Sequence, residues 1–399
     1  MPPNPPAVHG EGRQLVGIIG SGLIGLTPFD RQSWSGISYF FFTECQRQGL
    51  LRRAFGVEVS SLKRGLLMAA NYSPNRRRWR ARYYMDPRYR DALTREISKK
   101  IAPEDFQRSF LQIGAMYDVP RLVHGRAPCF SYHDGNMAQS LRSPYAVKGL
   151  SAEVIDRGLA YEKQVYRGLT RIFTMSEFLR QSFIKDFDVP PEKVVSIGAG
   201  INLEQIPAEV PDKKYDRRDL LFIGVDFDRK GGWDLLKAFV QVRQKFPDAT
   251  LHIVGPRQLS IPPELQAGVV YHGFLRKQDP AGGPKLAQLF RDCSVFVMPS
   301  LYEPFGIAPL EAMVHQLPCV VTNDWALEEM VVRGQTGEHV ECGKADDLAA
   351  KLITLLGDPQ KLVQMGAAAR QRVLNYYTWD KVVGRLREAV AATPKYQPQ

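Results

Sequence analysis

The strongest constraint on the fold is an alternation of strand-like and helix-like segments that runs along the whole chain. Short apolar, β-branched runs typical of buried strands occur in the first half at residues 15–20, 55–61, 109–116, 127–134, 170–176 and 192–198. They occur in the second half at residues 219–226, 249–256, 269–275, 294–300, 318–323 and 337–342. Amphipathic segments with helical spacing separate these runs. Such alternation predicts parallel strands in sheets that helices cover on both faces.

We therefore predict an α/β protein with two Rossmann-like, doubly wound domains in series, because 399 residues are too many for one ordinary core. The helices predicted in the first half are residues 36–49, 86–101, 151–168 and 177–187. Those predicted in the second half are residues 233–246, 285–292, 306–315, 326–333, 345–356, 361–376 and 380–392.

Composition sets the predicted domain boundaries. Residues 1–14 have no apolar core and are expected to form a disordered tail. Residues 201–219 are polar, contain two prolines and lack any period, as is typical of a linker. We place the first domain at residues 15–205 and the second at 206–378. Residues 379–399 are predicted to form a C-terminal helix that packs back on the first domain.

The excess positive charge lies entirely in the first half. Residues 1–200 hold 29 Lys and Arg against 18 Asp and Glu, whereas residues 201–399 hold 24 of each. The density is highest in NRRRWRARYYMDPRYR, residues 75–90. A one-sided basic surface indicates an anionic partner, or else a solvated face with no partner. The interleaved aromatic residues are compatible with RNA, but no nucleic-acid module surrounds them. We expect an anionic membrane surface and no nucleic acid as the partner.

The location of the protein is predicted from what its sequence lacks. Its five cysteines are scattered without a C-x-x-C pair, which favours reduced thiols over a disulfide framework or a zinc site. No apolar run approaches the roughly 18 residues of a membrane span, and the N-terminus is unlike a secretory signal. We expect a cytoplasmic protein that can bind peripherally to the inner face of the membrane.

The glycine-rich stretch GSGLIG, residues 20–25, follows the first predicted strand and matches a dinucleotide-binding fingerprint. A true site of this kind needs a helix to begin at the second or third glycine. Pro28 and the polar residues after it prevent that, and the first convincing helix begins only at Gly36. The acidic ribose partner is also missing, because Glu44 falls inside a predicted helix. We therefore expect no NAD site, but a loop and helix start that can face a phosphate or a sugar.

The most informative stretch is VFVMPSLYEPFGIAPLEAMVHQLPCVVTN, residues 295–323. A buried strand ends at Ser300, a loop carries Glu303, and a helix begins near Gly306 with Glu311 on its second turn. Ligands of open α/β sheets bind at such carboxyl ends of strands. The free backbone N–H groups suit phosphate, and the carboxylates suit the hydroxyl groups of sugar or ribose. Alternatively, Glu311 is a helix-face carboxylate that only stabilises the fold.

The motif YEPFGIAPLEAM, followed by LPCVVTN, resembles the donor-site signature of family-four glycosyltransferases of the GT-B fold. The resemblance extends to LLFIGVDFDRKGGWDLLKAF, LHIVGP, VYHGFL and DDLAAKLITLL, and in the first half to WSGISYFF, SYHD, TMSEFLRQSF and EKVVSIGAGIN. It covers most of the chain. It implies transfer of a sugar, with retention of the anomeric configuration, from a nucleotide sugar bound between the two domains. The first domain would hold the acceptor and the second the donor.

The resemblance also implies which residues are catalytic. Glu303 would contact the donor sugar hydroxyls, His133 would lie near the donor sugar, and Lys230 corresponds to the phosphate-binding lysine of the family. One departure is Val225, where the family usually has an arginine. We expect Arg229, beside Lys230, to supply the missing charge. If it does not, a catalytically weak nucleotide-sugar binder or scaffold is the alternative.

The donor-binding residues that the resemblance implies are Gly36, Gly224, Phe274, Leu275, Phe305, Gly306, Ile307 and Glu311. Among them, Glu311 would bind the nucleotide ribose, and the backbone from Phe305 to Ile307 would meet the sugar and the phosphates. Phe274 and Leu275 would lie beside the base. A single glycine at Gly36 departs from the glycine pair that is common in the family.

We expect no metal and no cofactor, with a UDP-sugar as the commonest donor of the family and a glycan or lipid-linked acceptor. Fixed cations can stabilise a departing nucleoside diphosphate without a metal. No enzymic nucleophile is evident, which favours a front-face route in which the leaving phosphate helps to deprotonate the acceptor. Three alternatives stay open: DFD at residues 226–228 could hold a divalent metal, His133 could be a buried structural residue, and the fold also suits an epimerase.

Overall fold

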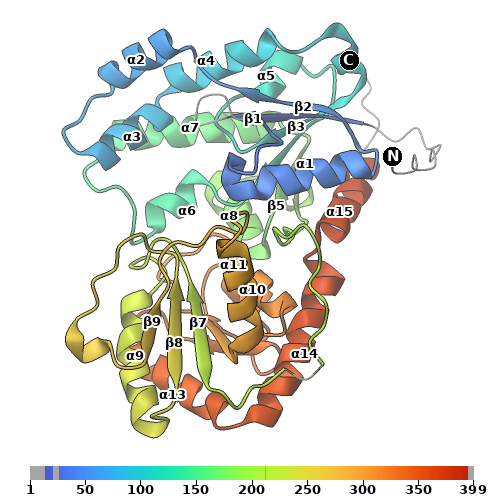
Figure 1. Ribbon diagram of the computed structural model, residues 1–399. Helices are drawn as coiled ribbons and strands as arrows, with labels where there is room; N and C mark the ends of the chain where they lie inside the picture. Colours follow the sequence, from blue (N-terminus) through green and yellow to red (C-terminus); the bar gives the residue numbers. More distant parts are fainter. Residues whose placement is uncertain (1–13, 21–26, 212, 394–399) are drawn as a thin grey trace.

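The computed structural model describes residues 14–20, 27–211 and 213–393. The chain forms two α/β domains, one above the other in Figure 1. Two parallel six-stranded sheets confirm the predicted fold class of two Rossmann-like domains. Residues 1–13 of the predicted tail, and the part of GSGLIG after Gly20, lie outside the described residues.

The first sheet has the strand order β2-β1-β3-β4-β5-β6, and all its strands are parallel. These strands are β1 (Leu15–Gly20), β2 (Leu51–Val57), β3 (Ser109–Ile113), β4 (Cys129–His133), β5 (Arg171–Thr174) and β6 (Val194–Ser196). The chain reverses its direction of travel across the sheet between the neighbours β1 and β3. A doubly wound sheet opens a binding crevice at such a point.

Helices cover both faces of the first sheet. One face packs against α4 (Pro87–Ser98), α5 (Val119–Val123), α7 (Ala152–Gly168) and α8 (Glu177–Phe187). The other face packs against α1 (Ile37–Arg47). The remaining helices of this domain are α2 (Ser61–Ala70), α3 (Arg76–Met85) and α6 (Met137–Arg142).

The second sheet has the order β12-β11-β10-β7-β8-β9 and is also parallel. Its strands are β7 (Asp219–Ile223), β8 (Thr250–Val254), β9 (Val269–Tyr271), β10 (Val295–Met298), β11 (Cys319–Thr322) and β12 (Gly337–Val340). Counted from its own first strand, this is the dinucleotide-fold order 3-2-1-4-5-6. The switch point therefore lies between β7 and β10.

The helices of the second domain also form two layers. One face packs against α9 (Gly232–Lys245) and α13 (Ala345–Leu356). The other packs against α10 (Gly282–Asp292), α11 (Ile307–Val314) and α12 (Leu327–Met330). The long helix α14 (Pro359–Tyr376) contributes to both cores, with Leu362 in one and Val373 in the other.

The last helix, α15 (Trp379–Ala391), leaves the second domain and packs beside α1 on the first sheet (Figure 1). Trp379 lies 5.8 Å from Phe41, measured between ring centroids, and Val382 and Leu386 are fully buried in the same cluster. A Cβ atom on Gly200 would lie 2.5 Å from the Trp379 ring, so only glycine lets the backbone before β7 pass so close. Helix α15 thus connects the second domain to the core of the first.

All twelve predicted strands occur, but the second was placed too late. We predicted residues 55–61, whereas β2 is Leu51–Val57 and residues 61–70 form α2. Two adjacent arginines, Arg52 and Arg53, interrupt the apolar run at the start of this edge strand. In the structure Arg53 is ion-paired with Asp105. Helices α2 and α3 were not predicted. No residue of α2 is buried, so it has no apolar stripe facing a core.

We predict that Trp379→Ala lowers the free energy of unfolding by about 3–5 kcal/mol, because it removes a buried indole from the α1–α15 interface. Urea unfolding followed by tryptophan fluorescence and circular dichroism measures this loss. Lys381→Ala, on the exposed side of the same helix, is the matched control. A Trp379→Ala protein as stable as the control would show that α15 does not hold the domains together.

Candidate active site

The site begins at the switch point of the second sheet, where β7 and β10 end side by side. Gly224 follows β7, and a Cβ atom there would lie 2.9 Å from Cγ of Lys230. The absence of a side chain at Gly224 lets the Lys230 side chain lie over the end of the strand. Gly231 has φ 72°, and a Cβ atom there would clash with the Pro299 carbonyl. Glycines thus seat the turn at 229–231 against the loop that follows β10.

Two cations meet one carboxylate at this point. The Lys230 ammonium forms an ion pair with Glu303, which is only 4 % exposed. The Arg229 guanidinium lies 3.7 Å from the same carboxylate and donates a 2.8 Å hydrogen bond to the Tyr302 carbonyl. Burying a charged carboxylate is costly unless it is paired with such groups. Arg229 is also ion-paired with Asp226, 3.5 Å away, so the cluster joins two cations and two carboxylates.

Val225 and Arg229 bear on the predicted departure from the family pattern. Val225 is 61 % exposed at the end of β7 and brings no charge to the site. Arg229 approaches from the following turn, where its backbone N–H donates to Asp226. Its guanidinium therefore reaches the cation cluster from another side. That it replaces the missing arginine in stabilising a leaving group stays a prediction.

Glu311 lies one helical turn and a loop away from Glu303. It is 5 % exposed on α11, whose N-cap is Gly306, and it forms an ion pair with Lys277. Lys277 also donates to the Asn202 carbonyl over 3.3 Å, so it connects Glu311 to the segment between the domains. We did not predict Lys277, because nothing local marks a lysine 34 residues before its partner.

The other predicted donor-binding residues surround this helix start. Phe305 and Ile307 pack against the apolar cluster that α1 and α15 form with the first sheet. Leu275 packs into the core around α10 and α11. Phe274 is 37 % exposed, with the Arg257 guanidinium 4.8 Å from its ring centroid. An exposed ring near a cation can stack on a base.

The first domain contributes a strained loop. Trp34, Ser35 and Gly36 have φ angles of 46°, 56° and 86°, and two of these three residues are not glycine. The strain is held by contacts on both sides: the Asn202 amide donates to the Ser35 carbonyl over 3.2 Å, and the Trp34 indole donates to Asp134 over 3.0 Å. Strained backbone of this kind gathers at ligand-binding sites.

His133 is placed at the end of β4, as predicted, but its ring is enclosed. It is 2 % exposed, lies edge-on to Tyr166 and Phe183, and shares a 2.8 Å hydrogen bond with the Ser131 hydroxyl. Burial lowers the pKa of His133 to about 3. The imidazole is therefore neutral at physiological pH, and one of its nitrogens is already engaged.

Asp134, the next residue, faces the second domain. Burial raises the pKa of its carboxyl, and the charge of Glu303 raises it further, whereas the hydrogen bond from Trp34 lowers it. Asp134 and Glu303 are therefore close enough across the cleft to feel each other's charge. The sequence pointed to His133 in this motif, whereas its neighbour Asp134 is the residue that the charge of Glu303 in the second domain influences.

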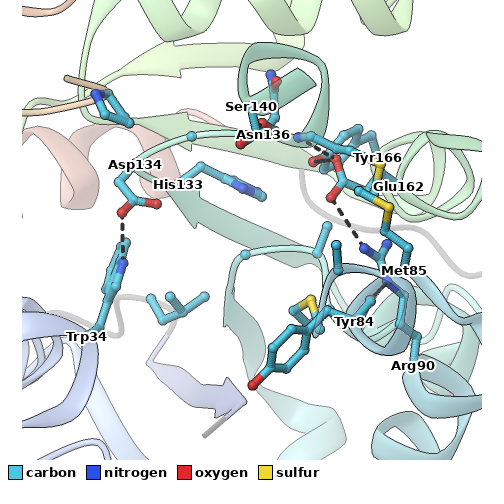
Figure 2. Close-up of a pocket in the computed structure, with 18 of the residues that line it drawn as sticks. Trp34, Tyr84, Met85, Arg90, His133, Asp134, Asn136, Ser140, Glu162 and Tyr166 are labelled. Carbon is cyan, nitrogen blue, oxygen red and sulfur yellow. Dashed lines mark hydrogen bonds and ion pairs between the residues drawn. The ribbon is translucent and has the colours of Figure 1, made fainter. Parts of the chain in front are cut away.

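A cavity of about 590 Å³ lies between the domains at this place. Figure 2 shows His133 and Asp134 on one side, with Trp34 below Asp134 and with Tyr84, Arg90 and Glu162 farther along. Tyr302 and Pro304 of the second domain close it. We call this cavity the cleft pocket.

The predicted metal alternative has its carboxylates otherwise engaged. Asp226 accepts from the backbone of Arg229, and Asp228 accepts from the Trp233 indole over 2.5 Å. Within residues 14–20, 27–211 and 213–393, no group of three His, Cys, Asp or Glu side chains has the arrangement of a metal site. All five cysteines are free thiols, and only Cys342 is exposed.

The facing sheets and the carboxylate–lysine pairs at the cleft define the class: this is a two-domain α/β enzyme of the GT-B fold, with its site at a topological switch point. Residues 206–372 match the family model "Glycosyl transferases group 1". The chain is a glycosyltransferase, and its similarity to that family model lies in residues 206–372.

Individual relatives agree with this assignment. Glycogen synthase of Mycobacterium tuberculosis is 27% identical over 295 residues, which cover 72% of this chain and 67% of that protein. D-inositol 3-phosphate glycosyltransferase of Pseudarthrobacter chlorophenolicus is 35% identical over 161 residues, 39% of this chain and 38% of the other. The crystal structure of Anabaena HepE in complex with UDP and glucose superposes with a TM-score of 0.62 at 16% identity, covering 95% of this chain and all of that one.

The structure thus brings together Glu303, Lys230 and Arg229 in one cluster and sets Glu311 beside it on α11. It lines the adjoining cleft pocket with His133, as predicted, and also with side chains that we did not predict: Trp34, Asp134, Arg90 and Glu162. Among these four, only Asp134 had a local signal, the Asp-Gly pair that follows His133. No helix of the described residues is both long and apolar enough to cross a membrane.

Proposed function

We propose that this protein transfers a sugar from a nucleotide-sugar donor to an acceptor, with retention of the anomeric configuration and without a metal ion. The observation that carries the proposal is the cluster of Lys230 and Arg229 on Glu303 at the switch point. It offers fixed positive charge where a diphosphate would lie and a carboxylate where sugar hydroxyls would lie. UDP is the donor nucleotide that we propose first. The proposed acceptor is a glycan or a lipid-linked molecule.

The donor would lie along the end of the second sheet. Glu311 would accept hydrogen bonds from the ribose hydroxyls, and the free N–H groups at the start of α11 would face phosphate oxygens. Phe274 and Leu275 would border the base. Lys277 is ion-paired with Glu311, so ribose binding would compete for that carboxylate or share it.

Transfer would follow a front-face route. The bond from the anomeric carbon to the diphosphate oxygen breaks, and the bond to the acceptor oxygen forms on the same face. The acceptor proton passes to the departing phosphate oxygen. Lys230 and Arg229 would stabilise the negative charge that develops there. His133 takes no part as a base, because its imidazole is enclosed and bonded to Ser131.

The test is a panel of nucleotide sugars scored for slow hydrolysis and for transfer, with proton NMR of the first-formed product. We expect the product to keep the donor's anomeric configuration, and turnover to persist in excess EDTA. An inverted product would exclude the front-face route. Binding of a donor without hydrolysis or transfer would leave the binder or scaffold alternative, and isomerised donor would indicate an epimerase.

We predict that Lys230→Ala lowers kcat by roughly 10²–10³-fold while changing the dissociation constant for the donor much less, because the lysine acts on charge that appears in the transition state. Steady-state kinetics and donor titration separate the two effects. Lys237→Ala, on the exposed face of α9, is the matched control. Unchanged turnover in Lys230→Ala would remove this lysine from the mechanism.

A basic surface of the first domain supports a second proposal, that the enzyme binds anionic membranes peripherally at the cytoplasmic face. Arg64, Arg76 and Arg80 line a hollow of about 590 Å³ between α2 and α3, and no acidic residue lines it. The guanidinium groups of these three arginines make no hydrogen bond or ion pair with the described part of the chain. Beside them, Leu62 and Leu66 are 79 % and 65 % exposed.

We predict that vesicles containing phosphatidylglycerol sediment the protein at low salt, whereas phosphatidylcholine vesicles do not. The triple variant Arg64→Gln, Arg76→Gln, Arg80→Gln should bind on the order of 100-fold more weakly, since each arginine near an anionic surface contributes about 1 kcal/mol. A control that changes three exposed lysines of the second domain, Lys237, Lys245 and Lys344, to Gln should bind as the wild type does. Equal loss in both variants would mean that net charge alone matters, and would overturn the assignment of this surface.

A further inference from the structure

Arg90 is a buried cation whose side chain is only partly bonded. It lies on α4 at the floor of the cleft pocket and is 2 % exposed. Its Nε donates a 2.8 Å hydrogen bond to the Tyr84 carbonyl. Its Nη1 is buried and has no hydrogen-bond partner within the described residues. Because a buried polar group without a partner is costly, such a group in a native site needs an explanation.

Glu162 does not supply that explanation. Its Oε1 lies 3.8 Å from Arg90 Nη2, beyond hydrogen-bond distance. Its other oxygen accepts from the backbone N–H of Met137 over 3.1 Å and from the Tyr166 hydroxyl over 2.9 Å. Arg90 is thus ion-paired with Glu162 without a hydrogen bond to it, and its guanidinium lies 5.2 Å from the Tyr161 ring centroid. Neither contact gives Nη1 a hydrogen-bond acceptor.

Arg90 lines the same cleft pocket as Asp134 and Tyr302, beside the proposed reaction site. Figure 2 shows Arg90 and Glu162 on one side of the cavity and Asp134 and Trp34 on the other. Gly114, at the end of β3, has φ 72°, and a Cβ atom there would meet no atom within 4 Å, so the wall is open at that point. A volume of about 590 Å³ is in the range of pockets that take small-molecule ligands.

We propose that Arg90 binds an oxyanion, a phosphate or a carboxylate, of the acceptor, so that the acceptor is an anionic molecule with its reacting hydroxyl near Asp134 and Glu303. The proposal rests on the proposed function, since it assigns the acceptor of that same site. A guanidinium presents parallel N–H donors that match two oxygens of one phosphate or carboxylate. A neutral hydroxyl would use only one of these donors.

The test is calorimetric titration of inorganic phosphate and of acetate into protein whose donor site is saturated with UDP. We expect Arg90→Gln to weaken the binding of the preferred anion by at least about tenfold. Glu162→Gln should bind that anion as tightly as the wild type or more tightly, because it removes a nearby negative charge while its amide oxygen can still accept from Met137 and Tyr166. Arg95→Gln, exposed on the same helix, should change nothing. Tighter phosphate than acetate assigns a phosphorylated acceptor, and the reverse a carboxylated one.

A merely structural role for the pair predicts a different pattern. In that case Arg90→Gln and Glu162→Gln both lower the melting temperature, and neither changes anion affinity relative to Arg95→Gln. That pattern, or the absence of any anion binding in the UDP-saturated protein, would overturn the proposal. UDP binding and donor hydrolysis, measured on the same samples, report on the proposed function separately. Normal donor hydrolysis without anion binding would refute only the assignment of Arg90.

Discussion

The packing of α15 against α1 is the contact on which the geometry of the cleft depends. The linker between β6 and β7 contains no helix or strand in its described residues, so it cannot fix how the two domains face each other. Helix α15 can, because it continues from α14 of the second domain and buries Trp379, Val382 and Leu386 on the first sheet. Glu329 adds a second tie by accepting from the backbone N–H groups of Glu177 and Phe178 at the start of α8. These two contacts thus fix how the two domains face each other across the cleft.

Two buried carboxylates of the second domain are each ion-paired with one lysine. Glu303 has Lys230 and Glu311 has Lys277, and both carboxylates are almost wholly removed from water. Unpaired, such buried charges would be costly. The lysines therefore compensate the negative charge of these two carboxylates. Arg229 adds a further cation beside Glu303 and is itself ion-paired with Asp226.

The sequence was sufficient for those parts of the fold and site that are local in the chain. The twelve strands could be found because each is an apolar run bounded by turn residues, and Glu303 and Glu311 because strand, loop and helix start follow one another within a dozen residues. Edge strand β2 was misplaced because its arginines look solvated until Asp105, 52 residues away, pairs with Arg53. Lys277, Trp34 and Arg90 were missed for the same reason. Each acts through a partner that only the tertiary fold brings near, and α2 has no buried face to give it a period.

The contrast between His133 and Asp134 shows what such local reasoning leaves undecided. A strand end places both residues at the cleft, but alternation along β4 turns successive side chains to opposite faces. His133 goes into the aromatic layer with Tyr166 and Phe183, where burial keeps it neutral, and Asp134 is left to meet Glu303 and Trp34. The same aromatic layer carries Tyr166, whose hydroxyl donates to Glu162, the ion-pair partner of Arg90. His133 is therefore part of the packing around the Arg90–Glu162 pair, and its influence on the site runs through shape and not through its own proton.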